Sequence, residues 1–274
     1  MDPMITTSHG RIAITESDGK GLTVLLIHGN SSCKEVFKDQ LQSELGHQYR
    51  LIALDLPGHG NSEDAERPES TYTMTGYADA ALQVMAAVHQ GPFAVVGWSL
   101  GGHIGLEMLA HTNSIVGLAI SGTPPIGPDP EEMGHGFLPN PHMAFTGQEL
   151  FSDDEAKIYA RVTCGDRRYE RFLEQAVLRT DGRARRVMME AALSGQGVNQ
   201  KHMAESTQVS LAIINGVEEA LVNNEYVGSL AYSALWQDKI HLIEGAGHAP
   251  FWDQPARFNQ LLAEFLLSVE STLD

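Results

Sequence analysis

Short apolar runs alternate with amphipathic helical patterns along most of the chain. Continuous apolar runs of this length are typical of strands that are covered on both faces. We expect strands at residues 22–27, 50–54, 93–96, 115–121, 209–214 and 240–243, and a half-buried strand at 9–16. Helical patterns separate them, mainly at residues 36–45, 77–88, 104–109 and 256–269. The strand, helix, strand order predicts an α/β fold with a mostly parallel central sheet flanked by helices.

The pattern changes between the fourth and fifth long apolar runs. Residues 122–147 are rich in proline and glycine, and residues 152–193 show helical patterns with no strand between them. Ser152 and Glu155 form a capping box at the start of one such helix. We therefore expect a core formed by residues 1–125 and 207–274, with a helical cap at 126–206.

The net charge and the lengths of the apolar runs indicate which kinds of partner the protein binds. The formal net charge of −17 over 274 residues argues against a nucleic-acid partner, because phosphate binding requires a basic surface. No apolar run reaches the roughly 18 residues of a membrane helix, and the first residues lack the pattern of a signal peptide. These features favour a cytoplasmic protein that binds a small molecule and contacts no membrane.

Cys33 and Cys164 lie far apart and match no metal-binding spacing, so we expect free thiols. The one dense basic patch, at 179–186, is interpreted as the solvated start of a helix.

A strand-to-helix transition at residues 93–102 contains the sequence Gly97-Trp98-Ser99-Leu100-Gly101. This pattern is typical of a nucleophile elbow, in which a serine lies on a sharp turn above the sheet. The N–H of Leu100 is then available to stabilise an oxyanion. The loop after the first long strand contains Asn30, whose N–H is the expected second donor.

A serine nucleophile needs a base and an acid that orients the base. His248 follows the last strand in a glycine-rich turn, where the base of such a fold is expected. Glu219 stands at the position of the acid after the preceding strand, with Glu218 and Asp129 as alternatives. His59 is interpreted as a loop hydrogen-bonding residue. The sequence contains no histidine cluster of the metal-dependent lactonase type and no nucleotide-binding loop, so we expect neither a metal nor a cofactor.

Taken together, these motifs resemble those of the α/β-hydrolase superfamily. Within it the chain is most similar to the metal-independent N-acyl-homoserine lactonases of the quorum-quenching type. The segments that carry this resemblance are 7–13, 28–32, 97–105, 122–125, 159–161, 180–186 and 247–251. The resemblance implies a triad of Ser99, His248 and Glu219, and a cap tyrosine, Tyr159, that hydrogen-bonds a substrate carbonyl.

The cap is rich in large apolar side chains, which commonly form ligand pockets where a cap meets its core. We assign substrate contact to Tyr159, Trp98, Phe137, Met143 and Phe145. The function expected from the resemblance is opening of the lactone ring of N-acyl homoserine lactones. Two alternatives are a general carboxylesterase or perhydrolase-type enzyme with the same triad, and a non-catalytic receptor for a small lactone.

Overall fold

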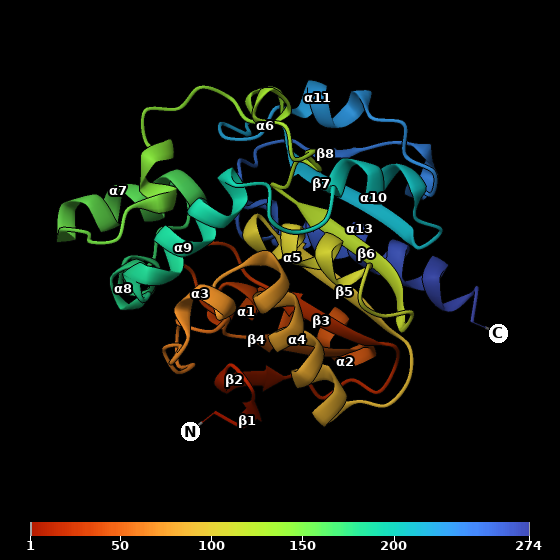
Figure 1. Cartoon of the computed structure of the whole chain (residues 1–274). Coiled ribbons are helices and arrows are strands. Elements are labelled where there is room, and N and C mark those ends of the chain that lie inside the picture. The colour runs from red at the N-terminus through yellow and green to blue at the C-terminus, as the bar shows by residue number, and fades with distance from the viewer. Residues whose placement is uncertain (1, 274) are drawn as a thin grey trace.

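The computed structural model describes residues 2–273, which form one sheet of eight strands with helices on both faces (Figure 1). The strand order is β1-β2-β4-β3-β5-β6-β7-β8, and the pairs from β4 to β8 are parallel. The strands are β1 (Met4–Thr7), β2 (Gly10–Glu16), β3 (Thr23–Ile27), β4 (Arg50–Leu54), β5 (Phe93–Trp98), β6 (Ile115–Ser121), β7 (Ser210–Gly216) and β8 (His241–Ile243). The predicted mostly parallel sheet is confirmed. The antiparallel edge strand β1 was not predicted from the sequence.

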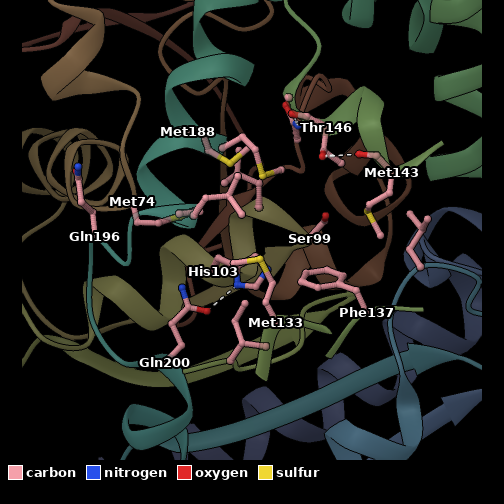
Figure 2. A pocket seen from close by; sticks show the side chains of 18 of the residues that line it. Met74, Ser99, His103, Met133, Phe137, Met143, Thr146, Met188, Gln196 and Gln200 are labelled. Carbon is pink, nitrogen blue, oxygen red and sulfur yellow. Dashed lines mark hydrogen bonds between the residues drawn. The ribbon is translucent and has the colours of Figure 1, made fainter. Parts of the chain in front are cut away.

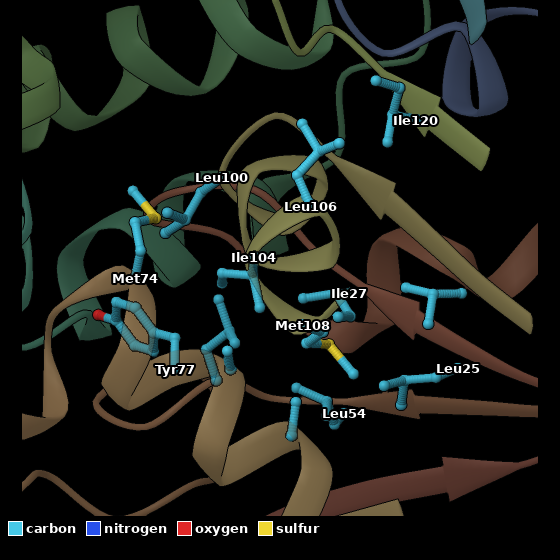
Figure 3. Packing of buried hydrophobic residues seen from close by; sticks show 14 of the residues in the cluster. Leu25, Ile27, Leu54, Met74, Tyr77, Leu100, Ile104, Leu106, Met108 and Ile120 are labelled. Atoms are coloured by element: carbon cyan, nitrogen blue, oxygen red, sulfur yellow. The ribbon is translucent and has the colours of Figure 1, made fainter. Parts of the chain in front are cut away.

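Alternate residues of the strands enter two hydrophobic cores, one on each face of the sheet. On one face Leu25, Ile27 and Leu54 pack beneath α4 (Met74–Val88) and α5 (Leu100–Met108), as Figure 3 shows. On the other face the intervening strand residues pack against α13 (Pro255–Glu270). Because each central strand is buried on both faces, its sequence is a continuous apolar run.

The residues between β6 and β7 form only helices and loops, as the sequence predicts (Figure 1). They comprise α6 (Pro130–Gly136), η2 (Met143–Gly147), α7 (Asp153–Cys164), α8 (Arg171–Arg179), α9 (Gly182–Leu193) and α10 (Gln200–Ser206). The predicted capping box is present at the start of α7, where Ser152 and Glu155 bond reciprocally. We call residues 126–206 the inserted segment.

The helix predicted at residues 36–45 is broken into three short pieces. Ser43 interrupts it, because its extended backbone and its side-chain bond to the N–H of Leu45 make it the N-cap of a new helix. The remaining helices are η1 (Lys34–Phe37), α1 (Lys38–Leu41), α2 (Glu44–Gln48), α3 (Pro68–Thr71), α11 (Asn224–Ser229), η3 (Trp236–Asp238) and α12 (Pro250–Asp253). Within residues 2–273, no helix has the length and apolarity needed to cross a membrane.

A buried ion pair joins the loops that follow β3 and β4. The ammonium group of Lys34 lies 2.8 Å from Oδ2 of Asp55, and both side chains are almost completely buried. The backbone N–H groups of Lys34 and Asn61 also donate to this carboxylate. Burial tends to lower the pKa of Lys34, but Asp55 and the neighbouring Asp2 raise it above its ordinary value. Lys34 therefore stays charged, and its contact with Asp55 fixes two loops at the carboxyl end of the sheet.

We predict that Lys34→Met lowers the free energy of unfolding by about 3 kcal/mol or more, because it leaves a buried carboxylate without its counter-ion. Urea denaturation at pH 7 measures this change. Arg11→Gln is the matched control, since the Arg11 and Glu63 side chains form an exposed pair and their loss changes stability far less. Similar losses for both variants would contradict the prediction.

Candidate active site

Ser99 lies at the sharp turn between β5 and α5. Its backbone angles, φ +53° and ψ −117°, lie outside the regions that L residues prefer. A Cβ atom on Gly97 would lie 2.3 Å from the carbonyl oxygen of Gly101, and one on Gly101 would lie 2.0 Å from that of Ile27. The two glycines therefore let the helix begin directly against the strands. The turn presents Ser99 at the carboxyl end of the sheet.

His248 and Glu219 also lie at the carboxyl end of the sheet, on the loops that follow β8 and β7. Nδ1 of His248 lies 2.8 Å from Oε2 and 3.1 Å from Oε1 of Glu219. Gly122, with φ +59°, leaves room for the imidazole, because a Cβ atom there would lie 2.7 Å from its Cε1. The ring is held on its Nδ1 side, so Nε2 remains available to a group in the cavity.

The Glu219 carboxylate is fully buried. Burial by itself raises its pKa, but His248 and the backbone N–H groups of Leu221 and Val222 lower the pKa below the ordinary value. Glu219 is therefore ionised at neutral pH and only accepts hydrogen bonds. It follows that Nδ1 of His248 carries a proton, which selects one tautomer of the ring.

The two alternative carboxylates lie elsewhere. Glu218 is exposed, and its oxygens accept hydrogen bonds from the Arg167 guanidinium at 2.8 and 3.1 Å. Asp129 lies in the inserted segment, on the loop before α6. Of the three candidates, Glu219 is the one that contacts His248.

The N–H groups of Asn30 and Leu100 have no acceptor within residues 2–273. Both residues line the same cavity as Ser99. The Asn30 side chain donates from Nδ2 to the carbonyl oxygen of Thr146 at 2.9 Å and to the hydroxyl oxygen of Tyr159 at 3.4 Å. The loop after β3 is thus bonded to two parts of the inserted segment.

The basic patch at 179–186 was predicted to be solvated, but one of its residues, Arg185, is not. Its side chain is buried, and its guanidinium donates to backbone carbonyls and to the hydroxyl of Ser31. Because Ser31 accepts from Arg185, its own proton goes to Oδ1 of Asn30, at 3.1 Å. This fixes the Asn30 amide with Nδ2 toward Tyr159. A directed hydrogen-bond chain therefore ends at the Tyr159 hydroxyl, whose proton has no acceptor in the described chain.

The turn and the inserted segment enclose a cavity of about 620 Å³. Ser99 lies on its wall, as Figure 2 shows, and so does His248. Most of the remaining surface is apolar. Its methionines come from both sides, and they are Met74, Met133, Met143, Met188 and Met189. Flexible side chains of this kind suit an apolar ligand of variable length.

Three of the five predicted contact residues line this cavity: Tyr159, Phe137 and Met143. Trp98 does not line the cavity. Its side chain points to the face of the sheet that is covered by α13, and its Nε1 donates to the carbonyl oxygen of His248 at 2.9 Å. Phe145 is also absent from the wall and packs behind Tyr159, with ring centroids 5.8 Å apart. The structure does not bring these two side chains to the cavity, because sequence pattern does not give side-chain direction at a strand end or within a short helix.

Several wall residues were not predicted from the sequence, including Met74, Met188, His103 and Gln200. A signal was available for His103, which follows Ser99 by four residues and therefore lies one helical turn away. The two methionines and Gln200 reach the cavity only through packing between distant helices. His59 matches its predicted role, since its Nδ1 bonds to the carbonyl oxygen of Pro57.

Cys33 and Cys164 are free and buried, as expected. In the part of the chain that the structure describes, no three histidine, cysteine or acidic side chains are grouped as metal ligands would be.

Crystal structures of the N-acyl homoserine lactonase AidH are similar to the chain, with a TM-score of 0.95. A variant in complex with N-hexanoyl homoserine lactone is 46% identical and covers 98% of both chains. A complex with N-butanoyl homoserine is 47% identical and covers 98% of this chain and 97% of AidH.

More distant relatives include esterases. The pimeloyl-[acyl-carrier protein] methyl ester esterase of Neisseria meningitidis is 26% identical over 267 residues, which cover 92% of this chain and 78% of the relative. An aryl esterase structure from Burkholderia cenocepacia shares the fold, with a TM-score of 0.81 at 24% identity and coverage of 99% and 100%. The model of the alpha/beta hydrolase family matches residues 24–261. The chain therefore belongs to the alpha/beta hydrolase family, and its relatives place it among the carboxylic-ester hydrolases.

Proposed function

We propose that the protein is a serine hydrolase that opens the lactone ring of N-acyl homoserine lactones, and so acts in quorum quenching. One observation carries the proposal: Ser99, His248 and two N–H groups that have no acceptor within residues 2–273 border one apolar cavity, and Glu219 holds His248 from behind. The likeness to AidH, which was crystallised with such a lactone, supports the choice of substrate.

In the proposed reaction, Nε2 of His248 takes the Ser99 proton as Oγ attacks the lactone carbonyl carbon. Glu219 keeps the imidazole in the required tautomer and stabilises its protonated form. The backbone N–H groups of Asn30 and Leu100 stabilise the tetrahedral oxyanion.

The ring C–O bond then breaks, and His248 protonates the leaving oxygen. The homoserine stays attached to Ser99 as an acyl-enzyme. Water, deprotonated by His248, hydrolyses this ester and releases the N-acyl homoserine. The reaction needs no metal or cofactor, because the protein groups supply the nucleophile, the base and the oxyanion donors.

We further propose that residues 126–206 form a cap over the core of residues 1–125 and 207–274, and that this cap binds the acyl chain. Tyr159 accepts a hydrogen bond from Asn30, so its own hydroxyl proton is available to the amide carbonyl of the substrate. Burial raises the pKa of Tyr159, which keeps the phenol protonated and able to donate.

A general carboxylesterase is the alternative, since the methyl ester esterase relatives are hydrolases of the same family. Chromatography of N-hexanoyl homoserine lactone and its ring-opened acid after incubation tests the proposal. Methyl hexanoate and p-nitrophenyl butyrate serve as competing ester substrates. Faster hydrolysis of these esters, with no ring-opened acid formed, would favour the esterase.

We predict that Ser99→Ala lowers kcat for the lactone at least about a thousandfold, because it removes the nucleophile without removing a core contact. Steady-state kinetics on purified protein measures the loss, and circular dichroism controls for folding. Near-normal turnover by the variant would rule out the serine mechanism.

The acid of the triad is tested with two adjacent glutamates. Glu219→Gln should lower kcat on the order of a hundredfold or more, since an amide neither selects the tautomer nor stabilises the imidazolium. Glu218→Gln is the matched control and should have little effect, because Glu218 contacts Arg167 at the surface. The opposite order would assign the role to Glu218.

Recognition of the acyl arm gives a third prediction. Burial in the cavity should raise kcat/KM about three- to fourfold for each added methylene until the cavity is filled. Tyr159→Phe should slow N-hexanoyl homoserine lactone much more than γ-butyrolactone, which has no amide carbonyl. Equal losses on both substrates, with rates independent of chain length, would show that the cap does not bind the acyl group.

A further inference from the structure

His103 is a polar side chain in the apolar part of the cavity. It lies on α5, one helical turn after Ser99, and both residues line the cavity (Figure 2). Its Nδ1 lies 2.6 Å from Oε1 of Gln200, a largely buried residue at the start of α10. The mechanism proposed above uses neither residue.

The contact with Gln200 determines what His103 offers a ligand. Burial lowers the pKa of His103, and the nearby His248 adds to this effect, so the ring is neutral at pH 7. With Oε1 of Gln200 as the acceptor, the single ring proton lies on Nδ1. Nε2 therefore carries a lone pair, and it has no partner among residues 2–273.

Most of the side chains that line the cavity with His103 are apolar. Met74, Met133, Phe137 and Met188 line the same part of the cavity, as Figure 2 shows. An alkyl chain that filled this space would remove water from Nε2 without replacing its hydrogen bond. A ligand with a hydroxyl group at this point would instead donate to Nε2.

The reach of an acyl arm from Ser99 fits this position. The third carbon of the acyl chain is five bonds from the lactone carbonyl carbon, roughly 6 Å when extended. The four residues from Ser99 to His103 advance roughly 6 Å along the axis of α5. A substituent on that carbon can therefore come near His103 while the lactone carbonyl is at Ser99.

We propose that His103, oriented by Gln200, is a binding site for a hydroxyl group on the acyl chain of the substrate. This assignment rests on the lactonase function proposed above. The hydroxyl donates its proton to Nε2 of His103. A ketone at the same carbon has no proton to donate, and an unsubstituted chain offers neither group.

The test compares N-(3-hydroxyhexanoyl), N-(3-oxohexanoyl) and N-hexanoyl homoserine lactones. The unmodified enzyme should show a kcat/KM about tenfold higher for the hydroxy compound than for the unsubstituted one, with the oxo compound below the hydroxy compound. This part needs no variant. Equal values for the hydroxy and oxo compounds would overturn the assignment of Nε2 as the acceptor.

His103→Leu should bring the ratio of hydroxy to unsubstituted substrate close to one, and should raise kcat/KM for the unsubstituted lactone. Met188→Leu is the matched control, because it changes the wall of the same cavity without changing its polarity and should leave the ratio intact. A ratio that survives His103→Leu would overturn the proposal. Failure of the unmodified enzyme to open any of the three lactones would refute the lactonase function itself.

Discussion

The close contact between the turn at Ser99 and the end of β3 is the constraint on which the site depends. The backbone of Gly101 lies against the carbonyl of Ile27, where no side chain fits. A Cβ atom on Gly29 would also lie 3.2 Å from Cβ of Ser99, so the loop after β3 runs directly past the serine. This packing brings the N–H of Asn30 to the same cavity as that of Leu100. In the proposed mechanism these two segments, about seventy residues apart, together bind the oxyanion.

The buried cation of Arg185 connects the inserted segment to that position. A guanidinium only donates hydrogen bonds, so the direction of every bond that follows it is determined. Ser31 must donate to Asn30, and Asn30 must present its amide nitrogen to Tyr159. Arg185 thus determines the direction of a series of hydrogen bonds. The series begins in the inserted segment, passes through the loop after β3 and ends at Tyr159 on α7.

The sequence predicted those features that depend on neighbouring residues. The turn at Ser99 could be recognised because its glycines, strand and helix are contiguous, and the parallel sheet because its buried strands are continuous apolar runs. Features that depend on packing between distant segments could not be predicted. Arg185 has the local pattern of an exposed helix residue, but the inserted segment folds over it and supplies its acceptors. Trp98 adjoins Ser99 in sequence and still points to the other face of the sheet.

The two proposals assign both oxyanion stabilisation and binding of the acyl hydroxyl to residues of helix α5. Its first turn leaves free N–H groups beside Ser99, because no residue precedes them in the helix to accept their bonds. Its second turn places His103 on the same face, since residues four apart lie one above the other. A change of helix packing would therefore move both groups together. In the proposed reaction, the attacked carbonyl lies at Ser99 and the polar group of the acyl arm lies at His103. The helical turn between these two residues, and not a loop, therefore sets the distance at which a polar group is recognised.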